Sequence, residues 1–212
     1  MKRRARAGWV AGAAMGLTGL GAGGALLLVA TVCLTSGCST LGYYAQSVNG
    51  HLDLVQRARP VSDWLAEPST GTELKQRLVL SQQIRDFAVS ELGLPNNPSY
   101  RRYADLQRSA AVWNVVAAPE LSLTLETWCF PVAGCVAYRG YFSEAAARSF
   151  AAKLQKQGDD VVVGGVPAYS TLGRTADPLL NTVGHYGELD LAALVFHELA
   201  HQVVYVGGDT AF

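Results

Sequence analysis

The residues best suited to chemistry in this 212-residue chain are His197, Glu198 and His201, in the run His-Glu-Leu-Ala-His. Leu, Ala, Val and Phe on both sides predict a helix over residues 189–206. In a helix, residues four apart lie one above the other. Glu198 then stands about 100° from His197 and about 60° from His201. All three side chains therefore point into one sector.

This arrangement is typical of zinc hydrolases. Two neutral imidazoles hold Zn²⁺, and the carboxylate beside them takes the proton of the water that the metal activates for attack on a carbonyl. The alternative is a helix whose histidines are ordinary polar groups, but a glutamate is costly in so apolar a helix. We therefore expect His197 and His201 to bind Zn²⁺ and Glu198 to act as the general base.

Three further residues could assist such a reaction. Tyr169 and Tyr186 could donate to a tetrahedral intermediate, and His185 could stabilise an oxyanion. A loop histidine is more often simply solvated, and tyrosines more often serve in cores or turns. The sequence favours these structural interpretations, and none of the three enters the predicted site.

The order of the predicted helices and strands indicates an α+β fold, in which a helical first half and a small β-sheet precede the helix that carries the motif. The apolar spacing predicts a helix over residues 72–92, stopped by Gly93, and Ser143 is expected to cap a helix to about Gln157. Further helices are expected after Ser99 and after Asp177, which precedes a proline. Strands are predicted over residues 111–116, 121–125, 136–142 and 160–163.

The first 37 residues have the order of a secretory signal. Basic residues at 2–6 precede a long uncharged stretch that ends in small residues before Cys38. We expect residues 1–37 to be a lipoprotein signal peptide and Cys38 to carry the lipid that anchors the domain of residues 38–212 to a membrane. An uncleaved transmembrane helix is the alternative. Both place the body outside the cytoplasm, and we expect a membrane-anchored lipoprotein of the cell envelope that faces the periplasm.

The net charge indicates which partners to expect, and the cysteines indicate where a disulfide forms. Four of the 17 basic residues lie in the leader, which leaves 13 against 17 acidic residues and a net charge of −4. No basic stripe is visible, so nucleic acid is not an expected partner. Cys129 and Cys135 enclose a short Pro/Gly loop and predict a disulfide in an oxidising compartment, with a metal site as the alternative.

Several motifs together resemble a family of bacterial lipoproteins described as putative aminopeptidases. They lie at residues 42–44, 103–106, 112–115, 117–120, 128–132, 134–136, 138–142, 168–173, 196–202 and 208–212. The resemblance covers essentially the whole mature chain. It implies a zincin-like zinc metallopeptidase that acts on peptide substrates.

The chain departs from that family at its C-terminus. The resemblance implies a third zinc ligand on the following helix, a glutamate that we expect beyond residue 212, in a chain truncated before it. The histidine-type alternative is excluded by Val204 and Gly207, and Asp209 is better explained as a turn residue.

The primary interpretation is a membrane-anchored zinc-dependent peptidase, an aminopeptidase by resemblance. The alternative is a catalytically inactive envelope lipoprotein with a binding or scaffolding role. Exo- or endopeptidase action, substrate preference, oligomeric state and the activity of the truncated chain are not determined by the sequence.

Overall fold

The computed structural model describes residues 40–130, 134–168 and 170–206, and the chain divides into two compact units, Met1–Ala45 and Gln46–Phe212. In the first unit, the described residues 40–45 are helical. The predicted signal peptide and Cys38 lie outside the described residues. None of the helices in the described ranges is both long and apolar enough to cross a membrane.

The second unit is α+β, as predicted. Its helices comprise residues 46–57, α2 (Val61–Ala66), α3 (Thr72–Ser90), α4 (Glu144–Gln157), a 3₁₀ turn (Asn181–Val183) and α5 (Glu188–Ala200). Its short strands β1 (Arg59–Pro60), β2 (Arg102–Ala104) and β8 (Leu179–Leu180) form one sheet in the order β1-β2-β8. A two-stranded sheet pairs β4 (Trp128–Phe130) with β5 (Gly134–Val136).

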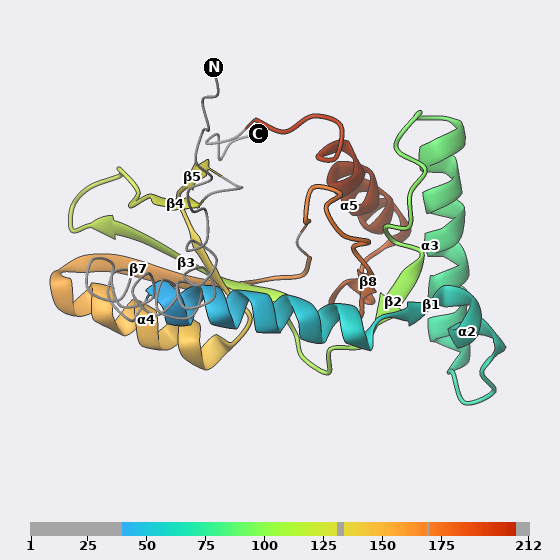
Figure 1. Ribbon diagram of the computed structural model, residues 1–212, viewed down its shortest axis with the longest axis horizontal. Coiled ribbons are helices and arrows are strands. Elements are labelled where there is room, and N and C mark those ends of the chain that lie inside the picture. Colours follow the sequence, from blue (N-terminus) through green and yellow to red (C-terminus); the bar gives the residue numbers. More distant parts are fainter. Residues whose placement is uncertain (1–39, 131–133, 169, 207–212) are drawn as a thin grey trace, which may run out of the picture. The chain divides into compact units, whose positions relative to one another are not determined.

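The longest strands pair β3 (Val112–Pro119) with β7 (Asp159–Val166). They run antiparallel from Val112↔Val166 to Pro119↔Asp159, and β6 (Arg139–Tyr141) lies on the other side of β3. Helix α4 packs along this sheet (Figure 1). The predicted limits of α4 are confirmed: the Ser143 hydroxyl accepts from the Ala146 N–H, and Gly158 ends the helix at φ 98°.

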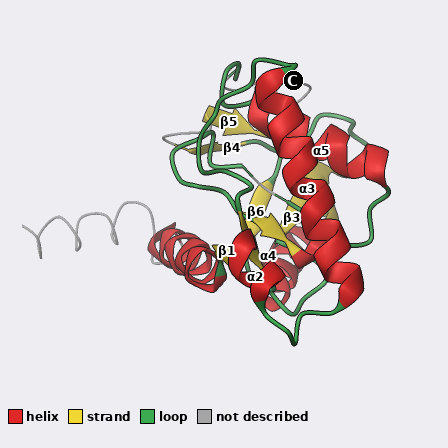
Figure 2. Cartoon of the chain, turned by 90° about the vertical axis from the view of Figure 1, so that its right-hand side faces the viewer, coloured by secondary structure: helices red, strands yellow, loops and turns green. Residues whose placement is uncertain are grey.

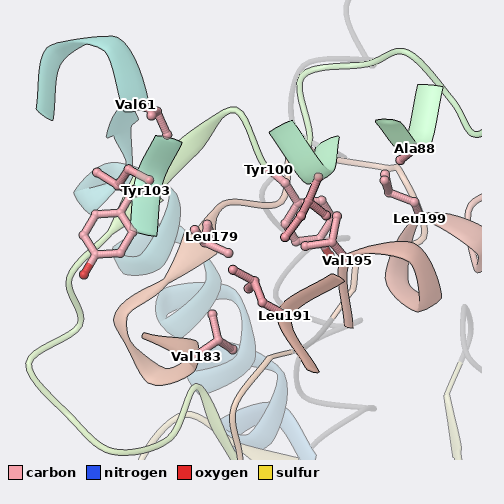
Figure 3. Packing of buried hydrophobic residues seen from close by; sticks show 11 residues of the cluster. Val61, Ala88, Tyr100, Tyr103, Leu179, Val183, Leu191, Val195 and Leu199 are labelled. Atoms are coloured by element: carbon pink, nitrogen blue, oxygen red, sulfur yellow. The ribbon is translucent and has the colours of Figure 1, made fainter. Parts of the chain in front are cut away.

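The face of α5 that packs inward is a stripe of aliphatic residues. Leu191, Val195 and Leu199 recur every four residues and are at most 2 % exposed. Figure 3 shows Val195 beside Tyr100, from the segment after α3, Leu191 near Leu179 of β8, and Leu199 beside Ala88 of α3. Helices α3 and α5 lie side by side (Figure 2). Burying this stripe fixes the rotation of α5, so the residues roughly 180° away face outward.

Three predicted elements are wrong: the strand over residues 121–125 and the helices after Ser99 and Asp177, the last of which is replaced by β8. Residues 121–125 form no strand despite their alternation, and Leu121 and Leu123 are fully exposed at 99 % and 101 %. Alternating residues form a strand only where a neighbouring strand shares their backbone hydrogen bonds, and no strand of the described residues pairs with residues 121–125. The helix expected after Ser99 is also absent, because Tyr100 takes φ 63° and the chain then enters β2.

Candidate functional site

Helix α5 carries the chemical motif at its C-terminal end. It spans Glu188–Ala200, so it begins one residue before the predicted start at 189 and ends six residues before the predicted end at 206, and acidic side chains occupy its first turn. His197 and Glu198 lie in its last turn, and His201 is the C-cap, still in the right-handed helical conformation. The His201 N–H donates to the His197 carbonyl at 3.1 Å, which keeps the two histidines in helical register.

The two imidazoles converge on one point. Their Nε2 atoms lie 2.9 Å apart and their ring centroids 4.4 Å apart. Two nitrogens bound to one tetrahedral zinc at about 2.0–2.1 Å would lie about 3.3 Å apart, so the pair fits Zn²⁺ after a small adjustment. Burial, followed by the neighbouring His197, lowers the pKa of His201 and favours the neutral form that binds metal.

Glu198 lies between the histidines and the buried stripe of α5. Its side chain is half-buried, because the rotation of the helix places it near the edge of the core. Burial, followed by the charge of Asp177, raises the pKa of Glu198 to about 7. A carboxyl group with such a pKa can both take up and release a proton near neutral pH, which suits a general base that later acts as an acid.

Asp177 is a buried hub and not the predicted helix cap. It is 4 % exposed, and its carboxylate accepts from the Thr171 N–H at 2.9 Å and the Thr171 hydroxyl at 2.7 Å. Its carbonyl accepts from the Tyr100 N–H at 2.7 Å, and the chain continues into β8 instead of a helix. Asp177 therefore connects the segment before β8 to the segment after α3. Its negative charge also helps to raise the pKa of Glu198.

Gln202, directly after the motif, is clamped by the segment that follows α3. Its side-chain oxygen accepts from Asn97 Nδ2 at 2.6 Å, and its nitrogen donates to the Ser99 hydroxyl at 3.2 Å. The buried Arg85 of α3 holds this segment by donating to the carbonyls of Ser99, Pro95 and Asn97. Sequence reasoning missed this contact, because about 100 residues separate the partners.

The outward face of α5 also lines an open groove of about 540 Å³. It is bounded by Asp190, Ala193, Leu194, His197 and the preceding Tyr186. Tyr186 thus borders the same groove as His197, while the His185 ring contacts Tyr186 edge-on at 5.0 Å between centroids.

The full set of metal ligands is not found in residues 40–130, 134–168 and 170–206. Within these ranges no group of three or more His, Cys, Asp or Glu side chains is arranged to hold a metal ion. Tyr169 and Asp209 lie outside the described residues. The site as described therefore offers two imidazoles and one carboxyl group.

The predicted disulfide is confirmed. Cys129 of β4 and Cys135 of β5 are bonded, with their Cα atoms 3.8 Å apart, as directly opposed residues of the two-stranded sheet. Their sulfurs are therefore unavailable to a metal site with the histidines.

A helix presenting two converging histidines and a carboxyl of raised pKa defines a candidate hydrolase site. The sequence profile of the family described as "Putative aminopeptidase" matches residues 42–212, and the chain belongs to this family. Neither the curated proteins nor the solved structures contain a match to the chain. The zincin-like architecture therefore stays a prediction, whereas the α+β class is confirmed.

Proposed function

We propose that the protein is a zinc-dependent peptidase, with His197 and His201 as two of its metal ligands. The observation that carries the proposal is the convergence of their Nε2 atoms to 2.9 Å on the outward face of α5. Membership in the putative aminopeptidase family supports peptide bonds as the substrate class. A site with two imidazoles needs a further ligand. We propose that this ligand comes from outside the described residues.

Each residue has a distinct role in the proposed reaction. Bound there, Zn²⁺ would polarise the peptide carbonyl and acidify the attacking water. Glu198 accepts the proton of that water and afterwards gives it to the nitrogen that leaves, so that one acid and one amine are released. Because its pKa is raised, Glu198 can both accept and donate this proton near neutral pH. The core beneath α5 holds the three side chains in register.

We further propose that the enzyme is tethered to the membrane by a lipid on Cys38 and acts outside the cytoplasm. The signal-like leader and the small residues before Cys38 support this location. The Cys129–Cys135 disulfide is consistent with it, because disulfides persist in oxidising compartments.

The test combines zinc content by elemental analysis with hydrolysis of a mixed set of synthetic peptides by the full-length protein. We expect near-stoichiometric zinc that is lost in His197→Ala. Glu198→Gln should keep the metal but lose activity by at least about 100-fold, the scale of general base catalysis. Glu73→Gln, an exposed glutamate in the first turn of α3, is the matched control. A metal-free protein, or full activity in Glu198→Gln, would refute the proposal.

A further inference from the structure

The groove on α5 has a polar end, an apolar middle and a metal-binding end. Asp190, Ala193, Leu194 and His197 are spaced three, four and seven residues apart and share one helix face. Asp190 supplies a carboxylate at one end and His197 an imidazole at the other. Ala193 and Leu194 form the apolar floor between them, and Tyr186 borders it. A ligand that fits all three parts carries a cation, an apolar body and a group that reaches the metal site.

The Asp190 carboxylate is accessible for such a cation. Its side chain is exposed in the first turn of α5, and one of its oxygens lies 3.3 Å from where a Cβ on Gly187 would stand. The absence of a side chain at Gly187 thus leaves room for the carboxylate at the end of the groove. The ion pairs of the described residues do not include Asp190.

The length of the groove determines how many residues it holds. Seven residues of helix place the Cα atoms of Asp190 and His197 about 10 Å apart, and both side chains tilt the same way. A salt-bridged hydrogen bond takes up about 2.8 Å at one end and a metal contact about 2 Å at the other. The remaining gap matches two residues of extended peptide at about 3.3 Å each. An amine only one residue from the scissile carbonyl could not reach Asp190.

We propose that this groove binds the two residues on the N-terminal side of the scissile bond, with the α-ammonium of the first held by Asp190. The inference rests on the proposed peptidase function and deepens it. Water adds across the bond after the second residue, releasing a dipeptide with a new carboxylate and leaving a new amine on the shortened peptide. The floor of Ala193 and Leu194 favours apolar residues in these positions.

Binding is measured first, because it does not depend on turnover. The probe is Leu-Leu linked through its C-terminus to a fluorophore, with a free or an acetylated amine, titrated into the full-length protein by fluorescence anisotropy. We expect the free amine to bind at least about 10-fold more tightly, as expected for a charge-assisted hydrogen bond. Asp190→Asn should abolish that preference. Glu188→Gln removes an equal charge two residues away, outside the groove lining, and should retain it.

The source of the cation is tested with an acetyl-Lys-Leu probe on the same fluorophore, which carries its ammonium on a side chain. We expect it to bind no better than acetyl-Leu-Leu. Equal binding of free and acetylated Leu-Leu, or tight binding of acetyl-Lys-Leu, would overturn the proposal.

Analysis of the products then tests the two-residue groove separately from the proposed peptidase function. With apolar hexapeptides, mass spectrometry should detect a dipeptide as the first product from the free-amine peptide. Turnover that depends on Glu198 but releases single amino acids, or ignores acetylation, refutes the two-residue groove and leaves the peptidase intact. No turnover of any peptide refutes the proposed function, while the anisotropy titration still decides whether Asp190 binds the ammonium.

Discussion

Removing the Gln202 side chain should loosen the C-terminal end of the motif helix. In Gln202→Ala, Asn97 Nδ2 loses an acceptor at 2.6 Å and the Ser99 hydroxyl loses a donor at 3.2 Å. Ser99 is 1 % exposed, so water does not readily replace the lost partner. His201 is the residue immediately before Gln202, so we expect its position to depend on this clamp.

The expected loss follows from these two bonds. A typical intramolecular hydrogen bond contributes about 0.5–1.5 kcal/mol, so Gln202→Ala should lower the free energy of unfolding by about 1–3 kcal/mol. Gln202→Glu keeps the acceptor for Asn97 and loses the donor to Ser99, so its loss should be smaller. Because residues that orient metal ligands typically change metal affinity by about 10–100-fold, zinc affinity should fall at least about 10-fold in Gln202→Ala.

The assay is urea unfolding followed by circular dichroism, together with competition for zinc against a chelating dye. Gln157→Ala, in the exposed last turn of α4, is the matched control and should change neither quantity. If Gln202→Ala matches this control in both measurements, the clamp does not position His201 and the reasoning fails. A stability loss without a change in zinc affinity would reduce the clamp to a purely structural role.

Two further predictions concern the fold. Gly50→Ala should destabilise by about 1–3 kcal/mol in thermal unfolding, because a Cβ there would overlap the ring of Phe142, whereas Gly164→Ala meets open space and should not; equal melting temperatures would contradict this. Burial raises the pKa of Tyr103 to about 12, from about 10 in the unfolded chain, so its stabilising contribution is complete below pH 10 and declines as the pH rises to 12. Tyr103→Phe should remove about 2–3 kcal/mol of that alkaline loss in urea unfolding at pH 9 to 12, and an unchanged pH profile would show that the phenol is not the cause.

Local signals predicted the elements whose residues interact with near neighbours. The Ser143 cap and Gly158 stop delimit α4, and the β-branched run at 160–163 lies within β7. These outcomes follow from backbone preferences and side-chain periodicity within a few residues. The predictions that failed concern residues whose structure depends on segments far away in the sequence. Residues 121–125 alternate but have no partner strand among the described residues, and whether a partner is present depends on the whole sheet.

In the candidate site, too, local features could be predicted from the sequence and long-range contacts could not. The spacing of His197 and His201 is sufficient to place both imidazoles on one face of a helix, because helical geometry is local. The roles of Asp177 and Gln202 depend on segments that lie far away in the chain, so no spacing could have revealed them. Sequence reasoning expected Asp177 to cap a helix, whereas tertiary contacts made it a buried hub.

The sequence by itself determined the chemistry available to this protein: two imidazoles and a carboxylate on one helix, a paired cysteine loop and an α+β pattern. Only the tertiary structure decided how that chemistry is tuned. Packing of Leu191, Val195 and Leu199 fixes the rotation of α5, and this rotation half-buries Glu198 and turns His197 outward. The physical reason is that residue type and spacing are local, whereas burial, pKa and the shape of a groove depend on segments that meet only when the chain folds.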